Sequence, residues 1–273
     1  MPLVLAAALT HGPGQLADFL GQPRNGCGRA SRPVALAVRC RHQLLEVAQV
    51  HGQPLTIDSA FANRTDAGRE LAAQLARVPA VAAAAIDGSL VVLGLPRGGV
   101  PIARVVADAL DAPLDVFVVR KLGAPMQPEL AVGAVASGGT RVLNDDLVRL
   151  IGLDAHDLDR LTERELRVVN ERDHAYRGSR QPLDVAGRTV VVVDDGLATG
   201  ATMRAALAAL RSLGAATLIV GVPVAAPESV RAALDIADDV IAVLTPDDFV
   251  AVGAWYRDFH QVSDREVRKA LDA

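Results

Sequence analysis

The sequence predicts an α/β fold: a Rossmann-like, mostly parallel sheet with helices on both faces. Short apolar runs rich in Val, Ile and Leu alternate with segments of helical period along most of the 273 residues. Several of these runs are apolar almost throughout, as expected of strands buried on both faces. Glycine-rich turns join strand to helix, which is typical of strand–helix–strand units and therefore of parallel sheets.

The alternation begins with a helix. Leu71, Leu75 and Val78 recur at helical spacing around residues 66–77, and Pro79 is expected to end this helix. The elements expected next are a strand at 89–95, a Gly-rich turn and helix at 96–110, a strand at 114–121, and short strands at 130–136 and 140–144. Residues 145–178 are charged and of mixed helical register, which predicts a helical insertion that is either a solvated helix or a lid.

The second half contains the most apolar strand, at 189–196. The elements expected after it are a glycine turn and helix at 198–214, a strand at 217–225, a helix at 227–235, a strand at 239–245 and a helix at 263–271. Ser263 is the expected N-cap of the last helix, and Glu266 completes a capping box. The stretch at 21–33 is rich in turn formers and lacks an amphipathic period, and 34–50 could form a helix or a strand. Residues 1–58 are therefore predicted to be an extension of uncertain order before a domain at 59–273.

Composition excludes several classes of function. The formal net charge of −4 argues against a general nucleic-acid or membrane-surface binder. Cys27 and Cys40 are the only cysteines, and no Cys/His spacing suits a metal site. No apolar run is long enough to span a membrane, and no basic residue precedes the short apolar stretch at the start. We therefore expect a cytoplasmic enzyme without a signal peptide and without a metal held by its own side chains.

Ligands of such sheets bind beyond the carboxyl ends of the strands. Asp194 and Asp195 end the most apolar strand, where burying either carboxylate would be costly, and two adjacent carboxylates suit a vicinal diol. The small and hydroxyl residues that follow leave backbone amides free to converge on an anion at a helix N-terminus. One turn therefore offers a diol site beside a phosphate site, as a ribose 5-phosphate requires; an ordinary surface turn is the alternative.

The segment DDGLATGATM at 194–203 resembles the 5-phosphoribosyl-1-pyrophosphate (PRPP) motif of type I phosphoribosyltransferases, in which a hydrophobic strand precedes two acids and a Thr-Gly turn. A Walker A loop and a GxGxxG loop do not fit it. The resemblance implies the type I phosphoribosyltransferase fold, a homodimer by family analogy, and ribose hydroxyls held by Asp194 and Asp195. The residues that it places around the 5-phosphate are Ala198, Thr199, Gly200, Ala201 and Thr202.

The segment LPRGGVPIA at 95–103 matches the family's pyrophosphate loop. The resemblance implies that Arg97, Gly98 and Gly99 bind pyrophosphate. The residue types suit this role, since glycines allow close backbone approach and a guanidinium pairs with phosphate oxygens. An ordinary glycine-rich strand–helix turn is the alternative.

The segment VVRKLGAPMQPEL at 118–130 resembles a strand end followed by a mobile loop that closes over PRPP. The resemblance implies that Arg120 and Lys121 contact PRPP. Only two of the 28 basic residues are lysines, Lys121 and Lys269. Because Lys121 falls at a predicted ligand-binding end, we favour a role in neutralising the departing pyrophosphate over a solvated surface charge.

The acceptor site matches the family least well. The resemblance implies a small C-terminal hood at about 245–262, in which Phe249 and Trp255 are the candidates to stack on a base. Packing of the hood onto the core is the alternative, and for Trp255 and Phe259 it is at least as good an interpretation. Ala198 stands where 6-oxopurine enzymes carry an Asp general base, and the strand at 217–225 lacks the Lys that reads a base oxygen. Adenine enzymes place a Glu in the mobile segment, and Glu129 is the nearest carboxylate here.

The resemblance therefore implies a pentosyltransferase of nucleotide metabolism. It would move the ribose 5-phosphate of PRPP to a small nitrogen acceptor, a nucleobase by analogy, with release of pyrophosphate and with Mg²⁺ bound mainly through PRPP. The candidate catalytic residues are Lys121, Glu129, Asp194 and Asp195. Two alternatives stay open: a non-catalytic PRPP or nucleotide sensor on the same fold, and a hydrolase of phosphoribosyl compounds, for which the spacing of the two acids is unfavourable.

Overall fold

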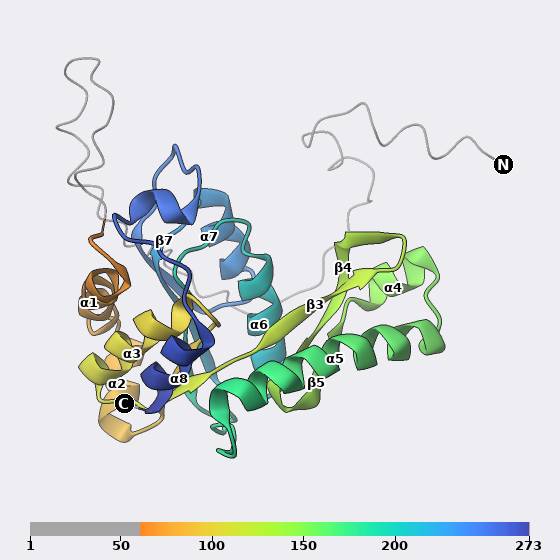
Figure 1. Cartoon of the computed structure of the whole chain (residues 1–273), viewed down its shortest axis with the longest axis horizontal. Helices are drawn as coiled ribbons and strands as arrows, with labels where there is room; N and C mark the ends of the chain where they lie inside the picture. The colour runs from red at the N-terminus through yellow and green to blue at the C-terminus, as the bar shows by residue number, and fades with distance from the viewer. Residues whose placement is uncertain (1–60, 273) are drawn as a thin grey trace, which may run out of the picture. The chain divides into compact units, whose positions relative to one another are not determined.

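The computed structural model describes residues 61–272, the side chains of residues 128 and 129 excepted, so the extension expected at 1–58 lies outside the described residues. A five-stranded parallel sheet forms the centre of this part (Figure 1). Its strands, in spatial order, are β2 (Leu114–Val116), β1 (Leu90–Gly94), β6 (Thr189–Val193), β7 (Thr217–Val224) and β8 (Asp239–Leu244). The strand order reverses between β1 and β6, so the loops after these two neighbours lie together at one edge.

Helices cover both faces of this sheet, as the sequence predicts. One face packs against α1 (Arg64–Leu75), α2 (Pro79–Asp87) and α3 (Gly99–Leu110), and the other packs against α6 (Ala201–Ser212) and α7 (Pro227–Leu234). In β6, the side chains of Val191 and Val193 belong to the apolar cluster on the face of α1, α2 and α3. Those of Val190 and Val192 belong to the apolar cluster on the face of α6 and α7. This explains why β6 is apolar at every position after Thr189: both of its faces are buried.

The helix expected at 66–77 begins at Arg64 and ends at Leu75, and the role expected of Pro79 is wrong. Pro79 is the first residue of α2, a helix that the sequence analysis missed. Proline has no amide hydrogen to donate and its φ is close to the helical value, so it suits the first position of a helix. The side chain of Asn63 caps α1 by accepting a hydrogen bond from the amide of Asp66 at 3.0 Å.

The strand expected at 114–121 is in fact two strands in two different sheets. β2 ends at Val116, and β3 (Val119–Ala124) pairs with β4 (Gln127–Ala136), which pairs with β5 (Thr140–Leu143), in a three-stranded antiparallel sheet. The mobile loop expected after residue 121 is therefore a hairpin. The sequence hides the change of sheet because only Phe117 and Val118, both buried and apolar, separate the two strands.

The charged region after β5 forms α4 (Asp145–Ile151) and α5 (Ala155–Arg177). The antiparallel sheet packs against α5 and against α6. A buried ion pair ties the end of α5 to the parallel sheet, because Arg177 Nε donates to both carboxylate oxygens of Asp115 in β2, at 3.0 and 3.2 Å. Arg177 also donates to the carbonyl oxygen of Val116 at 2.8 Å, so its buried charge is well satisfied.

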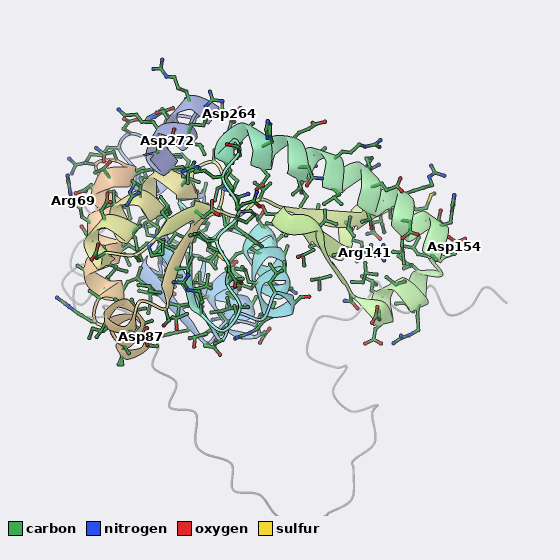
Figure 2. All side chains as sticks on the ribbon, turned by 90° about the horizontal axis from the view of Figure 1, so that it is seen from below. Arg69, Asp87, Arg141, Asp154, Asp264 and Asp272 are labelled. Carbon is green, nitrogen blue, oxygen red and sulfur yellow. The ribbon has the colours of Figure 1, made fainter. Side chains whose placement is uncertain are left out.

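The C-terminal part contains the 3-10 turn η3 (Val252–Trp255) and the helix α8 (Asp264–Asp272). The capping box is confirmed: the amide of Ser263 donates to Glu266 Oε2 at 2.8 Å, and the amide of Glu266 donates to Ser263 Oγ at 3.3 Å. Figure 2 shows Asp264 near the C-terminal end of α5 and Asp154 at its other end. No helix between residues 61 and 272 has the length and apolar character needed to cross a membrane.

Candidate functional site

The loop after β1 and the acidic pair after β6 are in direct contact. A Cβ atom built on Gly98 would lie 1.8 Å from Asp195 Oδ2, and one on Gly99 would lie 2.4 Å from the carbonyl oxygen of Val193. Only glycine allows this approach at either position. The structure therefore brings together Gly98, Gly99 and Asp195, which the sequence analysis assigned to one site from two separate segments.

Asp195 is held by a residue that the sequence analysis missed. Arg64, at the start of α1, donates to Asp195 Oδ2 from Nε at 3.2 Å and from Nη2 at 2.9 Å. Its remaining nitrogen donates to the carbonyl oxygen of His260 at 2.9 Å, and its guanidinium lies 4.0 Å from the ring centroid of Phe259. The side chain of Arg64 is only 9% exposed, so Asp195 takes part in an almost buried ion pair.

Aromatic side chains from both ends of the described chain support this pair. Tyr256 donates from its hydroxyl to the backbone carbonyl oxygen of Asp195 at 2.6 Å. The Tyr256 ring stacks on Phe259 at 4.9 Å between centroids and contacts Phe61 at 5.5 Å. Burial raises the pKa of Tyr256 far above its ordinary value, and the nearby Asp195 carboxylate adds to this, so the hydroxyl keeps its proton and remains a donor.

Asp194 differs chemically from its neighbour. Its Oδ1 accepts a hydrogen bond from the amide of Asp195 at 2.8 Å. Burial raises the pKa of Asp194 well above its ordinary value, and repulsion from the Asp195 carboxylate adds to the rise. Arg64 contacts Asp195 directly and stabilises its charge, so the adjacent acids form an unequal pair, one paired with a cation and the other disposed to hold a proton.

The turn before α6 has the features of an anion site. The side chains of Thr199 and Thr202 are exposed, and Gly200 adopts a left-handed φ of +69° at the helix N-cap. Within the part of the chain that the structure describes, the amides of Thr199, Gly200 and Thr202 donate to no protein acceptor. Buried Ser229 in α7 donates to the carbonyl oxygen of Ala198, which fixes the turn from behind.

The loop at 96–99 carries one exposed cation. Arg97 pairs with Asp264 of α8 at 3.6 Å, and its side chain is 37% exposed. The peptide bond between Pro96 and Arg97 is cis. The amides of Arg97 and Gly98 donate to no acceptor among residues 61–272, so this loop, like the turn before α6, presents donors that an anion can accept.

The structure separates two cations that the sequence analysis treated together. Arg120 donates from Nε to Glu165 Oε2 of α5 at 2.6 Å. Burial opposes ionisation of Glu165, but hydrogen bonds from Arg120 and Arg164 outweigh it, so the pKa of Glu165 is lowered. Lys121 is exposed and, as the next residue of β3, points to the opposite face of the strand. Contact of either residue with PRPP stays a prediction.

The hood lies against the acidic turn. A Cβ atom on Gly196 would be 2.5 Å from Val252 Cγ1. Phe249 and Trp255 are partly buried and pack on the apolar cluster beneath α1 and α3, and Trp255 accepts a backbone hydrogen bond from Phe61 at 2.9 Å. Stacking of either ring on a base stays a prediction. The proposed catalytic side chain of Glu129 lies outside the described residues.

Comparison with known proteins agrees with the geometry. A family model described as "Phosphoribosyl transferase domain" matches residues 61–259. The protein named "Putative phosphoribosyl transferase Rv0571c" of Mycobacterium tuberculosis is 48% identical over 212 residues, which cover 78% of this chain and 46% of that protein. The chain thus spans about half the length of the curated relatives that it matches.

One solved structure is similar over most of the described chain. The crystal structure of the protein TT1426 from Thermus thermophilus has 44% sequence identity and a TM-score of 0.71, covering 78% of this chain and 97% of that one. The fold predicted from the strand and helix pattern, and the family resemblance predicted from the motif after β6, are both confirmed.

Proposed function

Because the chain belongs to the phosphoribosyl transferase domain family, we propose that it transfers the ribose 5-phosphate of PRPP to a nitrogen acceptor and releases pyrophosphate. The observation that carries this proposal is the direct contact between Gly98 and Asp195, because it joins a loop with free amides to an acidic pair. The turn before α6, which follows the acidic pair at the end of β6, supplies a second set of amides without a protein acceptor in the described chain.

Each part of PRPP has a matching part of this site. Asp194 and the free oxygen of Asp195 suit the vicinal hydroxyls of the ribose. The turn at 198–202 suits the 5-phosphate, which the α6 N-terminus would stabilise through its amides and dipole. Arg97, the amides of 97–98 and Lys121 suit the pyrophosphate.

The reaction needs little covalent chemistry from the protein. The acceptor nitrogen forms a bond to C1 of the ribose while the bond from C1 to the pyrophosphate oxygen breaks, and pyrophosphate leaves with that electron pair. Positive charge develops on the ribose ring and negative charge on the leaving group. The work of the site is therefore positioning and electrostatic stabilisation, with the carboxylates near the ring and the cations near the leaving group.

The side chains fit a magnesium ion that arrives on PRPP rather than one held by the protein alone. Asp195 Oδ2 is occupied by Arg64, and the raised pKa of Asp194 makes it a poor direct ligand. When bound, Mg²⁺ would neutralise charge on the pyrophosphate. The outer carboxylate edges of Asp194 and Asp195 would reach its shell through water.

The acceptor is proposed at the level of its class, a small nitrogen nucleophile such as a nucleobase. Phe249 and Trp255 belong to the hood, which contacts the acidic turn through Val252, and they are the candidates to cover a planar ring. Glu129 is the proposed base that accepts the acceptor's proton. A homodimer, a cytoplasmic location and a role in nucleotide metabolism complete the proposal, and light scattering of the purified chain tests the dimer.

A non-catalytic PRPP or nucleotide sensor is the second candidate. One observation favours it: Ala198 occupies the position of a general base in 6-oxopurine enzymes, and the neighbouring strand β7 carries no cation to read a base. Both candidates require binding of PRPP, so binding alone does not separate them. Catalytic turnover separates them, because only the enzyme releases pyrophosphate.

Two measurements test the proposal. Calorimetric titration with PRPP and Mg²⁺ should give binding by wild type and about tenfold weaker binding by Thr202→Val, which keeps the side-chain shape but loses a phosphate donor. Asp146→Asn, an exposed substitution in α4, serves as the control. Pyrophosphate release across a panel of nucleobases then separates enzyme from sensor. No binding by wild type would overturn both candidates.

A further inference from the structure

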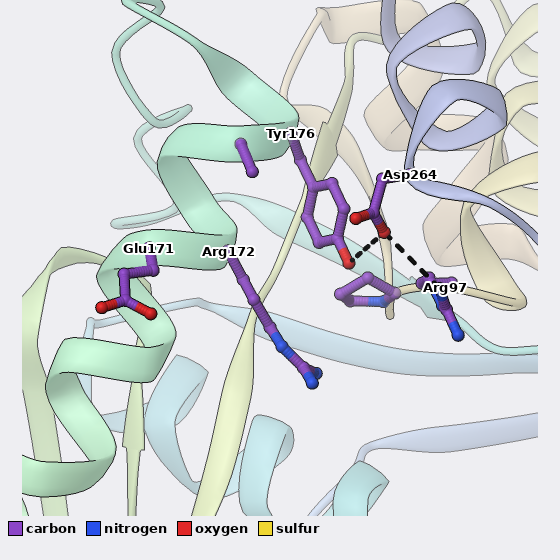
Figure 3. Close-up of a pocket in the computed structure, with 7 residues that line it drawn as sticks. Arg97, Glu171, Arg172, Tyr176 and Asp264 are labelled. Atoms are coloured by element: carbon purple, nitrogen blue, oxygen red, sulfur yellow. Dashed lines mark hydrogen bonds and ion pairs between the residues drawn. The ribbon is translucent and has the colours of Figure 1, made fainter.

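A cavity of about 340 Å³ opens beside the loop at 96–99, on the side of α5 and α8 (Figure 3). Pro96 and Arg97 of the loop form one wall, and Glu171, Arg172 and Tyr176 of α5 form the opposite wall. Asp264, the first residue of α8, lies between them. The cavity therefore adjoins the loop proposed for pyrophosphate but includes residues of the helical insertion, for which the family resemblance assigns no role.

The two arginines that line the cavity differ in their partners. Arg97 pairs with Asp264, whose Oδ1 also accepts a hydrogen bond from the Tyr176 hydroxyl at 3.2 Å. The exposed side chain of Arg172 makes no ion pair or hydrogen bond with any residue of the described chain. Figure 3 shows Arg172 extending from α5 along the cavity and the Glu171 carboxylate pointing away from Arg97. The cavity thus holds one cation that an internal carboxylate neutralises and a second that has no internal counterion.

The backbone of the adjoining loop has donors without a protein partner. The amides of Arg97 and Gly98 have no acceptor within residues 61–272. A ligand on Arg97 therefore lies next to a loop that has amides to offer. A diphosphate has oxygens on two linked phosphorus atoms and charge enough for two guanidinium groups, so its chemistry suits a cavity with one arginine on each of two walls.

We propose that Arg172 forms a second wall of the diphosphate site, and that Asp264 is the internal carboxylate that a bound diphosphate displaces from Arg97. The inference rests on the proposed function in one respect only, the source of the ligand: the diphosphate can be part of PRPP or free pyrophosphate. Asp264 then competes with the ligand for Arg97, while Arg172 attracts it. The two residues have opposite effects on affinity, which a merely structural role would not produce.

The test measures binding of three probes by calorimetry, each with Mg²⁺: PRPP, inorganic pyrophosphate and ribose 5-phosphate. Arg172→Gln should weaken binding of PRPP and pyrophosphate about tenfold and leave ribose 5-phosphate unchanged. Arg167→Gln is the matched control, because it removes the same charge from an exposed position on another face of α5. Asp264→Asn should tighten binding of pyrophosphate about fivefold, since it removes a competing charge and can keep the hydrogen bond with Tyr176.

The outcomes separate this inference from the proposed function. If wild type binds PRPP and Arg172→Gln binds it as tightly as Arg167→Gln does, the second wall is overturned while the proposed function stands. If Asp264→Asn binds pyrophosphate no more tightly than wild type, the displacement of Asp264 is overturned. Binding of pyrophosphate without binding of PRPP would support the cavity and overturn the proposed function. Binding of neither probe by wild type would overturn both.

Discussion

The two sides of the candidate site are built differently. On the side proposed for ribose, which we call the ribose side, Asp195 is fixed by Arg64 and Tyr256 through short contacts in an almost buried, aromatic environment. On the side proposed for pyrophosphate, Arg97 and the further PRPP candidate Arg120 are more than a third exposed and pair with carboxylates of α8 and α5. The ribose side is therefore preorganised, whereas Arg97 and Arg120 must change partners before they can bind a phosphate.

The largest effect in this comparison is expected from Arg64. Arg64→Met leaves the Asp195 carboxylate without its cation in a nearly buried position, which should cost about 3 kcal/mol of the free energy of unfolding and abolish measurable PRPP binding. Urea denaturation and calorimetry measure the two effects. Arg69→Met, an exposed substitution on the same helix, should change neither. An Arg64→Met variant as stable as Arg69→Met would show that the ribose side is not fixed by this pair.

The next largest effect separates two neighbouring glycines. A Cβ atom at Gly99 meets backbone, the Val193 carbonyl, whereas one at Gly98 meets the Asp195 side chain. Gly99→Ala should therefore lower the free energy of unfolding, by about 2 kcal/mol. Gly98→Ala should lower stability less, because the Asp195 carboxylate can rotate away from the added Cβ atom. It should weaken PRPP binding, because that rotation takes the carboxylate out of its position between Arg64 and the proposed ribose site.

Urea denaturation and calorimetry of the two glycine variants, compared side by side, test this distinction. If Gly98→Ala proves the less stable of the two, the Asp195 side chain is as rigid as the backbone. That outcome would make the preorganisation of the ribose side stronger than the contacts alone indicate.

Much of the parallel-sheet side could be predicted from sequence because its information is local. The strand, the two acids and the small-residue turn are contiguous at 189–202, and a parallel sheet follows from the alternation of strands and helices. The Arg64–Asp195 pair joins residues 131 positions apart, and no local pattern marks an arginine in the first turn of a helix as a partner. The sequence has four aromatic residues at 249–259, but the contacts of Tyr256 with Asp195 and of Phe259 with Arg64 depend on packing.

The antiparallel side was harder to predict for a different reason. Its first strand, β3, follows β2 after only two apolar residues. Hydrophobic periodicity alone therefore predicts one strand where the structure has two. The pairing of Arg120 with Glu165 depends on how α5 lies across the hairpin, and the mixed helical register of this charged region does not indicate which neighbour it faces. Long-range packing of charged, half-exposed surfaces leaves little trace in sequence.

The third prediction concerns the pH dependence of stability. The pKa of Asp194 in the folded chain is raised well above 3.8, so the native state binds more protons than the unfolded state as pH rises above that value. The free energy of unfolding should therefore fall with pH until the folded pKa is passed, by at most about 1.4 kcal/mol per pH unit. Asp194→Asn lacks this group, so its stability relative to wild type should increase with pH over the same window.

Urea denaturation of wild type and Asp194→Asn at a series of pH values checks the slope. Asp258 and Glu266, whose pKa values are lowered, contribute stability that is lost at acid pH, but they are present in both proteins and cancel in the difference. Parallel stability curves would mean that Asp194 is ionised as readily as an exposed carboxyl, and the two acids of the ribose side would then be equivalent.

The smallest effect is expected where the ribose side meets solvent. The ring of His260 lies between two carboxylates, with Nε2 at 3.0 Å from Glu266 Oε1 and Nδ1 at 3.1 Å from Asp258 Oδ1. The hydrogen bond with Glu266 contributes most to raising the pKa of His260, and the hydrogen bond with Asp258 adds to it. Because the pKa of His260 is higher in the folded chain than in the unfolded chain, the protonated ring stabilises the fold at pH values below the unfolded pKa. This stabilisation is lost as pH rises through the folded pKa. Glu266→Gln should therefore lower the pKa of His260 toward 6.5, as followed by NMR, while Glu70→Gln on α1 should leave it unchanged. The backbone carbonyl of His260 accepts a hydrogen bond from Arg64. An unchanged pKa in Glu266→Gln would mean that Glu266 does not hold the His260 ring, so that this carbonyl is positioned without that contact.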